Sequence, residues 1–202
     1  MDLSIQKLTK AFNHKTIFKD LSFEIRTGSR FAIAGANGSG KSTLIKILSG
    51  GTLASSGKIN YTLSGKKIDD AKLYRLVHFV APYNTVIEEL SLVELFDLHQ
   101  RLGLLKNHKD FKSWKALLQY PFVSDQQIKM YSSGMKQRVR LALALLDDRP
   151  LILLDEPGSN LDLQGKAWFQ SMLGQLSNSQ TVIIATNDPV ELGYCSERLD
   201  LE

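Results

Sequence analysis

The first part of the chain alternates short apolar runs with turn residues, which is the pattern of strands. Strands are predicted over residues 3–8, 17–25 and 31–34. A helical spacing of apolar residues follows over 43–49, and Gly50-Gly51 is expected to end that helix. Further short strands are predicted over residues 59–63 and 76–80. This opening region is therefore expected to be rich in β structure.

The pattern changes to helical spacing from residue 91 to about residue 148, where apolar residues recur three or four positions apart. Uninterrupted apolar runs return at residues 151–155 and 181–186, with an amphipathic stretch over 164–176 between them. Apolar strands separated by a helix are typical of a parallel sheet that is buried on both faces. The chain is therefore predicted to be an α/β protein with a helical lobe.

Length and composition fit one globular domain. The 202 residues are 43% hydrophobic and 23% charged, and a domain typically has about 100–200 residues. The net charge is +4, but the basic residues are scattered, which favours a solvated surface over a nucleic-acid-binding one. The single cysteine, Cys195, cannot close an intrachain disulfide, and neither a secretory signal nor an apolar run of about 18 residues is present. We therefore expect a reducing compartment.

A glycine-rich loop follows the strand predicted at residues 31–34. Residues 35–42 read Gly-Ala-Asn-Gly-Ser-Gly-Lys-Ser, which fits G-x-x-x-x-G-K-[ST] between a strand and a helix. In such a loop the backbone N–H groups surround phosphates, Lys41 reaches the β- and γ-phosphates, and Ser42 is a ligand of Mg²⁺. An ordinary glycine-rich turn does not explain the strand, the Lys-Ser pair and the helix together. The predicted nucleotide-binding residues are Gly35, Asn37, Gly38, Ser39, Gly40, Lys41, Ser42 and Thr43.

Two adjacent carboxylates follow the apolar run at residues 151–154. Ligands of open α/β sheets bind at the carboxyl ends of strands, where these side chains would lie. Asp155 is expected to hold Mg²⁺ through water, and Glu156 to orient or deprotonate the attacking water. A solvated acidic turn is the simpler interpretation, but the presence of a phosphate loop favours the catalytic one.

A resemblance to a known family becomes specific at residues 131–138, which read Tyr-Ser-Ser-Gly-Met-Lys-Gln-Arg. This segment resembles the signature L-S-G-G-Q-x-Q-R of ABC-type ATPase cassettes; Ser132 and Gly134 match, and the first, third and fifth positions differ. The order of the motifs is similar to that family over nearly the whole chain. The resemblance implies a P-loop ATPase fold with a mostly parallel core sheet, an N-terminal antiparallel β part and an inserted helical lobe. It further implies a single domain over residues 1–202, with its core at 1–90 and 149–202 and its lobe at 91–148.

The same resemblance implies roles for individual residues. In the family, the signature serine and helix start bind the γ-phosphate held by the opposite subunit; an ordinary N-cap at Ser132 or Ser133 is a compatible alternative. Phe12 matches an aromatic residue that stacks on adenine, although an aromatic beside a strand is equally well a core residue. Residues 159–162 resemble the D-loop, whose aspartate, here Asp162, shapes the site across the dimer. The implied cofactors are ATP and Mg²⁺.

Two positions depart from the family pattern. Pro82 stands where a glutamine is expected to contact Mg²⁺ and water, and proline has neither a side-chain oxygen nor an N–H. Asn84 would take that role only in a rearranged loop. Asn187 stands in place of the switch histidine; its amide is expected to donate a hydrogen bond to the γ-phosphate, but unlike histidine it cannot take up a proton and become positively charged. Slow ATP hydrolysis is therefore expected, and the retained Lys41 and Glu156 argue against a complete loss of activity.

The implied function is that of an ATP-binding and ATP-hydrolysing subunit of an ABC transporter, which dimerises around Mg·ATP and drives a separate membrane-spanning subunit at the cytoplasmic face of a membrane. A homodimer and a heterodimer both stay open. In its short length, with few residues after Asn187, the chain resembles the ATPases of cytochrome c biogenesis haem exporters. One alternative is a regulatory cassette that binds ATP without hydrolysing it. Another is a soluble ABC protein acting on nucleic acid or ribosomes, but such proteins generally carry two cassettes or added modules.

Overall fold

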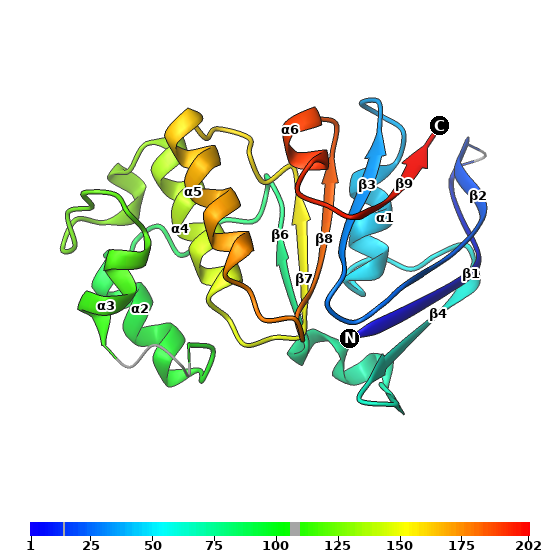
Figure 1. The fold of residues 1–202 in the computed structure, drawn as a ribbon, viewed down its shortest axis with the longest axis horizontal. Coiled ribbons are helices and arrows are strands. Elements are labelled where there is room, and N and C mark those ends of the chain that lie inside the picture. The colour runs from blue at the N-terminus through cyan, green and yellow to red at the C-terminus, as the bar shows by residue number, and fades with distance from the viewer. Residues whose placement is uncertain (14, 106–109) are drawn as a thin grey trace. The chain divides into compact units, whose positions relative to one another are not determined.

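A computed structural model describes residues 1–13, 15–105 and 110–202, which form two compact units (Figure 1). The first, called the sheet unit, comprises Met1–Phe79, Arg149–Glu156 and Ser177–Glu202. The second, called the helical unit, comprises Val80–Asp148 and Pro157–Leu176. The helical unit thus starts before the predicted lobe of residues 91–148 and also contains the amphipathic stretch that follows the acidic pair. The single domain over the whole chain stays a prediction.

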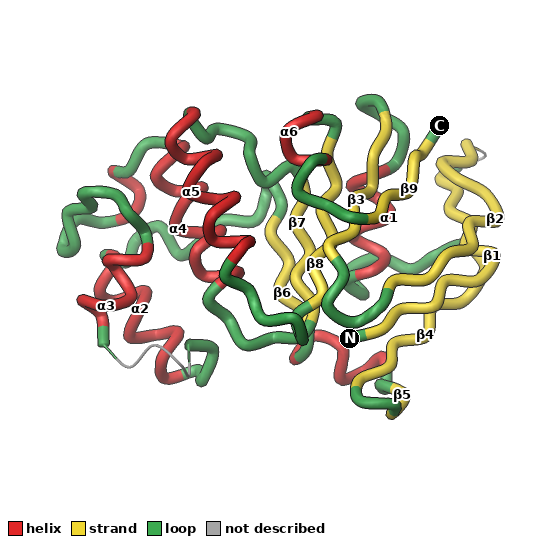
Figure 2. The backbone as a smooth tube through the Cα atoms, in the orientation of Figure 1, coloured by secondary structure: helices red, strands yellow, loops and turns green. Residues whose placement is uncertain are grey.

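The sheet unit contains an antiparallel sheet with the strand order β2-β1-β4-β5 (Figure 2). Its strands are β1 (Asp2–Phe12), β2 (Lys15–Ile25), β4 (Ser56–Leu63) and β5 (Lys66–Lys67). β1 and β2 are longer than predicted because backbone pairing continues past the alternating apolar residues, through register shifts that include the segment from Ile5 to Leu8. β5 was not predicted, since two exposed lysines carry no apolar signal.

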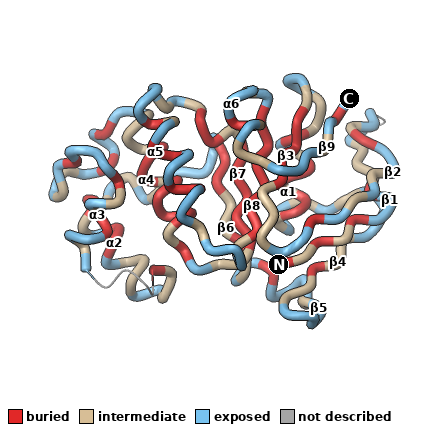
Figure 3. Tube along the Cα trace, viewed as in Figure 1, coloured by how far each residue is buried: buried red, intermediate tan, exposed pale blue. Residues whose placement is uncertain are grey.

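The second sheet of this unit has the order β6-β7-β8-β3-β9. Its strands are β3 (Arg30–Gly35), β6 (Val77–Val80), β7 (Leu151–Asp155), β8 (Thr181–Thr186) and β9 (Glu197–Leu201). β7, β8, β3 and β9 are paired in parallel, and β7 and β8 are buried along their whole length (Figure 3). These pairings confirm the predicted α/β fold with a buried parallel sheet. β9 was missed because its alternating charged residues have no uninterrupted apolar run.

Strand register brings the predicted site segments to one edge of the parallel sheet. Ala34 of β3 pairs with Thr186 of β8, and Asp155 of β7 pairs with Ala185. The loops that follow these three parallel strands therefore begin side by side. The loop after β3 leads into α1 (Lys41–Leu48), which starts two residues before the predicted helix. The loop after β8 leads into the short helix α6 (Pro189–Leu192). A 3₁₀ turn, η1 (Asp70–Arg75), precedes β6.

The helical unit contains α2 (Leu92–Arg101), α3 (Phe111–Leu117), α4 (Ser133–Leu145), α5 (Leu163–Gly174) and the 3₁₀ turn η2 (Ile128–Met130). A capping box between Ser91 and Glu94 starts α2. α4 begins directly after Ser132, whose side chain caps the helix at one of the two predicted N-cap positions. Among the described residues, none of the helices combines the length and the apolar character that crossing a membrane requires.

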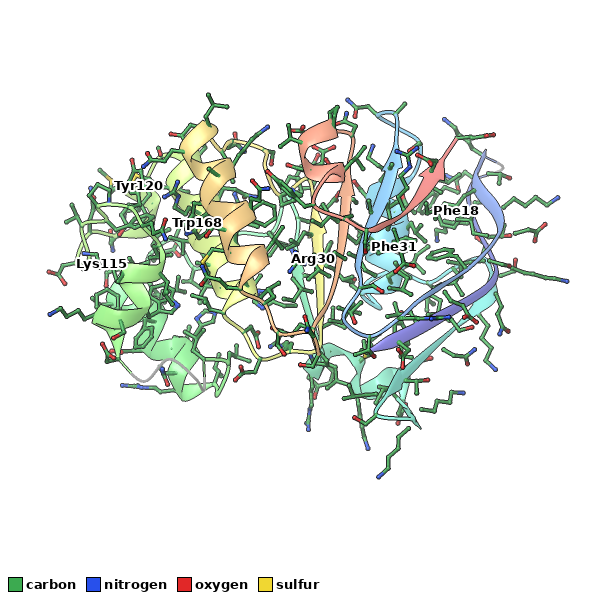
Figure 4. All side chains as sticks on the ribbon, viewed as in Figure 1. Phe18, Arg30, Phe31, Lys115, Tyr120 and Trp168 are labelled. Carbon is green, nitrogen blue, oxygen red and sulfur yellow. The ribbon has the colours of Figure 1, made fainter. Side chains whose placement is uncertain are left out.

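Arg138, within the segment resembling the signature, holds α4 in the helical unit. Its guanidinium carbon lies 5.2 Å from the ring centroid of Tyr120 and 5.0 Å from that of Trp168; both aromatic residues are labelled in Figure 4. The same guanidinium donates to the carbonyls of Leu118 at 3.1 Å and Gln119 at 2.9 Å. This arginine is therefore structural in the helical unit, which the motif alone did not indicate.

Candidate active site

The glycine-rich loop encloses a cavity of about 260 Å³ in the sheet unit. The residues around the cavity come from β2, from the loop after β3, from the first turn of α1 and from the end of β7. They are Ile17, Asn37, Gly38, Gly40, Lys41, Ser42, Thr43 and Glu156. The structure thus brings the predicted phosphate loop and the second predicted carboxylate to one cavity.

Gly40 shows why this loop requires glycine. It has a φ of +101°, in the left-handed region that glycine favours. A Cβ at this position would also lie 2.5 Å from Cγ2 of Ile17. The sequence patterns did not single out Ile17. An isoleucine in a predicted strand looks the same in the sequence whether it packs against a loop or in the core.

Lys41 is buried, and its ammonium lies within the loop. Nζ donates hydrogen bonds to the carbonyl oxygens of Gly35 at 2.8 Å and Ala36 at 3.0 Å. An ammonium has three N–H donors, so these two bonds still allow a third to an anion. Ser39 lies two positions before Lys41 in the same loop. Its hydroxyl is buried and has no hydrogen-bond partner among the described residues. A buried cation and an unpaired hydroxyl in a glycine-rich loop that leads into a helix together suit phosphate oxygens.

Ser42 and Asp155 are joined across the edge of the sheet. Ser42 Oγ donates to Asp155 Oδ1 at 3.0 Å. Burial raises the pKa of the Asp155 carboxyl; the hydrogen bond from Ser42 opposes that shift, and the neighbouring charge of Glu156 adds to it. A bound cation would favour the ionised carboxylate. The hydroxyl and carboxylate oxygens are the hard ligands that Mg²⁺ prefers, so the residues present fit this ion.

Glu156 is held in an uncommon backbone conformation at the end of β7. Its φ is +48°, and its N–H donates to the carbonyl of Ala185 at 2.8 Å. Non-glycine residues in the left-handed region cost about 1–3 kcal/mol and cluster at active sites. The bond to β8 holds the turn, so the Glu156 side chain is presented to the cavity of the loop.

Asn187 lies directly after β8 and contacts the loop. Its Nδ2 donates to Oδ1 of Asn37 at 2.8 Å. The structure therefore places the residue that replaces the switch histidine beside the phosphate loop, while its role toward a nucleotide stays a prediction.

Phe12 lies at the end of β1 and is 48% exposed. The ammonium of Lys10 lies 4.3 Å from its ring centroid. Phe12 is not among the residues that line the cavity described above. The exposed ring excludes the alternative of a core residue, and stacking on adenine stays a prediction.

The signature and D-loop residues lie together in the helical unit. The Ser132 hydroxyl accepts from the Met135 N–H at 3.2 Å, which confirms it as the N-cap of α4. A Cβ on Gly134 would lie 2.7 Å from the carbonyl oxygen of Asn160. Asp162 caps α5 by accepting from the Gly165 N–H at 2.7 Å. The start of α4 and the segment before α5 are therefore in close contact.

We expect Gly134→Ala to disturb this contact. Because a methyl group there would press on a backbone carbonyl, the free energy of unfolding should fall by about 1–3 kcal/mol. Urea denaturation followed by circular dichroism measures the change. The matched control is Gly174→Ala in α5, where a Cβ would meet nothing within 4 Å. That variant should be neutral or more stable by up to about 1 kcal/mol. Equal effects of the two substitutions would contradict the steric explanation.

The loop around Pro82 is fastened to α4 within the helical unit. Arg140 Nη1 donates to the carbonyls of Asn84 at 2.9 Å and of Ala81 and Pro82 at 3.4 Å each. Lys136, one turn before Arg140, forms an ion pair with Glu88. α4 therefore holds this loop through Arg140 and Lys136, although Pro82 itself offers no side-chain oxygen.

Residues 18–159 match the family model described as ABC transporter. The chain is 31% identical over 92% of its length to the uncharacterized ABC transporter ATP-binding protein YxlF of Bacillus subtilis, of which it spans 62%. It is 32% identical over 98% of its length to the aliphatic sulfonates import ATP-binding protein SsuB of Pectobacterium atrosepticum, of which it spans 73%. The chain therefore belongs to the ABC transporter family, and it forms the ATP-binding cassette of that family.

Solved structures support the same fold. A dimeric ATP-binding cassette in a post-hydrolysis state, bound to ADP and Pi, superimposes with a TM-score of 0.81 at 22% identity, over 99% of this chain and 94% of that one. At this identity the likeness shows the fold alone. Together with the two sheets and the helical unit, it confirms the predicted P-loop cassette fold.

Proposed function

We propose that this chain binds Mg·ATP and hydrolyses it slowly as the ATPase subunit of an ABC transporter. The observation that carries the proposal is the convergence of a buried cation, a hydroxyl–carboxylate pair and a carboxylate base at one edge of the parallel sheet. Lys41 and Glu156 line the same cavity, and Ser42 is bonded to Asp155 beside it. Membership of the family supports nucleotide binding, and the geometry indicates how the chemistry would be divided among these residues.

Phosphoryl transfer depends mainly on positioning and on neutralising charge. The backbone N–H groups of the loop and Lys41 would bind the phosphate oxygens, and Ser42 and Asp155 would hold Mg²⁺. The ion would supply a positive charge that offsets charge on the β- and γ-phosphate oxygens. Glu156 would accept a proton from the attacking water, with the oxygen of that water forming a bond to the γ-phosphorus as the bond to ADP breaks.

Slow turnover follows from two replacements. The Asn187 amide would donate a hydrogen bond to the γ-phosphate without positive charge, and a neutral hydrogen bond is roughly half as strong as a charge-assisted one. Pro82 would leave the metal and water without the side-chain oxygen of a glutamine. The retained Lys41, Asp155 and Glu156 favour weak activity over none.

The proposal includes dimerisation around ATP. α4 has 13 residues, its first turn contains no acidic side chain, and the capping residue Ser132 is exposed. Such a helix start suits an anion, and we assign it to the γ-phosphate bound by a second cassette, with Asp162 beside that interface. A homodimer and a heterodimer fit equally well.

We further propose that a separate membrane-spanning subunit is the partner and that the cassette acts at the cytoplasmic face of the membrane. The relative named as an import ATP-binding protein supports this role. ATP-driven dimerisation would shift the membrane subunit between two states, because ATP binds the closed dimer better than the open one.

Titration of the purified chain with ATP, with and without Mg²⁺, tests the proposal. Isothermal titration calorimetry should show saturable binding that Mg²⁺ strengthens, and analytical ultracentrifugation should show that ATP increases the dimer fraction. An absence of ATP binding would contradict the proposal. Binding with no release of phosphate would instead favour the regulatory cassette, for which Pro82 is the specific observation.

We expect Asn187→His to retain or raise ATP turnover, by about two- to tenfold where the imidazole is protonated, because a charged donor binds phosphate more strongly. An imidazole titrates near pH 6.5, so this gain should fade as the pH rises from 6 to 8, whereas the asparagine amide does not titrate in that range. Phosphate release at several pH values measures both enzymes. Turnover below that of wild type at every pH would contradict the interpretation of Asn187 as a weaker substitute donor.

A further inference from the structure

Asn37 and Asn187 meet because of strand register. Ala34 of β3 pairs with Thr186 of β8, so the loops after these strands leave the sheet together. Asn187 Nδ2 donates to Asn37 Oδ1 at 2.8 Å. Asn37 also lines the cavity of the glycine-rich loop. The hydrogen bond therefore joins the residue in the switch position to the wall of the phosphate site, with both side chains in the sheet unit.

The backbone on either side of Asn187 is restrained by hydrogen bonds. Before it, Thr186 ends β8, and the Thr186 hydroxyl accepts from the Asp188 N–H at 3.0 Å. After it, the Asp188 side chain caps α6 by accepting from the Val190 N–H at 2.9 Å, with Pro189 in the first turn. With the backbone restrained, Asn187 moves mainly by rotation about its side-chain bonds. Rotation about the terminal bond, χ2, has a broad and roughly twofold distribution.

That remaining freedom matters chemically. One end of a primary amide carries two N–H donors, and the other is an oxygen that only accepts. The oxygen end would repel a phosphate, and the NH₂ end would bind it. In this structure Asn37 presents its oxygen to Asn187, so the NH₂ end of Asn187 faces the loop. One N–H is used by Asn37, and the second N–H of the same group can bind a phosphate oxygen.

We propose that Asn37 is a positioning residue, which orients the Asn187 amide so that its second N–H binds the γ-phosphate. The two asparagines would then perform as a pair the function that a single histidine has in the family pattern. This inference rests on the proposed ATPase function, because it concerns a group that acts on the bound nucleotide.

A double-mutant cycle tests the pairing. Asn37→Ala, Asn187→Ala and the double variant are compared with wild type for kcat and for the KM of ATP. Each single substitution should lower kcat by about five- to tenfold while changing KM by less than about twofold, since the lost bond acts on the reacting phosphate. The double variant should be no slower than the slower single variant, because both substitutions remove one interaction.

The matched control is Asn178→Ala. Asn178 is exposed and precedes β8, so it lies at the opposite end of that strand from Asn187. Its kcat and KM should equal those of wild type. Circular dichroism checks the fold of every variant; Asn37→Ser, whose shorter side chain does not span the same distance, replaces Asn37→Ala if that variant does not fold.

The outcomes separate the inference from the proposed function. Normal kcat in Asn37→Ala, multiplicative effects in the double variant, or a raised KM at constant kcat would each overturn the positioning role. Wild-type protein that releases no phosphate from Mg·ATP would overturn the proposed function and this role with it.

Discussion

Lys41→Ala should weaken the binding of ATP by about 10- to 100-fold, since a hydrogen bond to a charged group contributes about 1.5–3 kcal/mol. The ammonium is buried and is held by two loop carbonyls, so it is already placed inside the cavity before any ligand enters. Such preorganisation means that the lost interaction is not replaced by water at equal strength. Titration calorimetry with Mg·ATP gives the two dissociation constants.

The control for Lys41→Ala is Lys66→Ala. Lys66 is an exposed residue of β5, so its substitution removes the same charge from the chain without touching the loop. Its dissociation constant for ATP should be that of wild type. Equal affinities for all three proteins would contradict the assignment of the loop cavity as the phosphate site.

Glu156→Gln should lower ATP turnover by about 100- to 1,000-fold and leave ATP binding intact. The amide has nearly the shape of the carboxylate but does not accept the proton of water, and general base catalysis contributes about 10²- to 10⁴-fold. Because hydrolysis would no longer open the dimer, ATP should accumulate in a stable dimer. Phosphate release measures turnover, and sedimentation velocity with Mg·ATP measures the dimer.

A matched control for Glu156→Gln is Glu24→Gln, at an exposed position of β2. This substitution should change neither turnover nor the dimer fraction. If Glu156→Gln hydrolysed ATP at the wild-type rate, another group would have to be the base.

The sequence predicted those parts of the fold that depend on local pattern. β7 and β8 were evident because strands buried on both faces are continuously apolar. The phosphate loop was evident because a fixed spacing of glycines, lysine and serine serves one kind of ligand. β9 was missed because its pairing with β3 is a tertiary effect, whereas the start of α4 was predictable because a serine N-cap is a local signal.

The candidate site was predictable residue by residue but not pair by pair. The motifs indicated Ser42, Asp155 and Asn187, and strand register decides which of them meet. Neither the contact of Ile17 with Gly40 nor the Asn37–Asn187 bond follows from a motif, since the partners are separated by 23 residues in the first case and by 150 in the second. The division into two units likewise depends on long-range packing, which placed α5 with the helical unit.

Steady-state release of phosphate from Mg·ATP by the purified chain is the most direct test of an ATPase whose chemistry depends on Lys41 and Glu156. Wild type, Lys41→Ala and Glu156→Gln are purified in the same way, so that a contaminating ATPase would appear equally in all three. We predict slow release by wild type that requires Mg²⁺ and falls by at least about tenfold in each variant. Equal rates from the three preparations would contradict the assignment of this site as an ATPase.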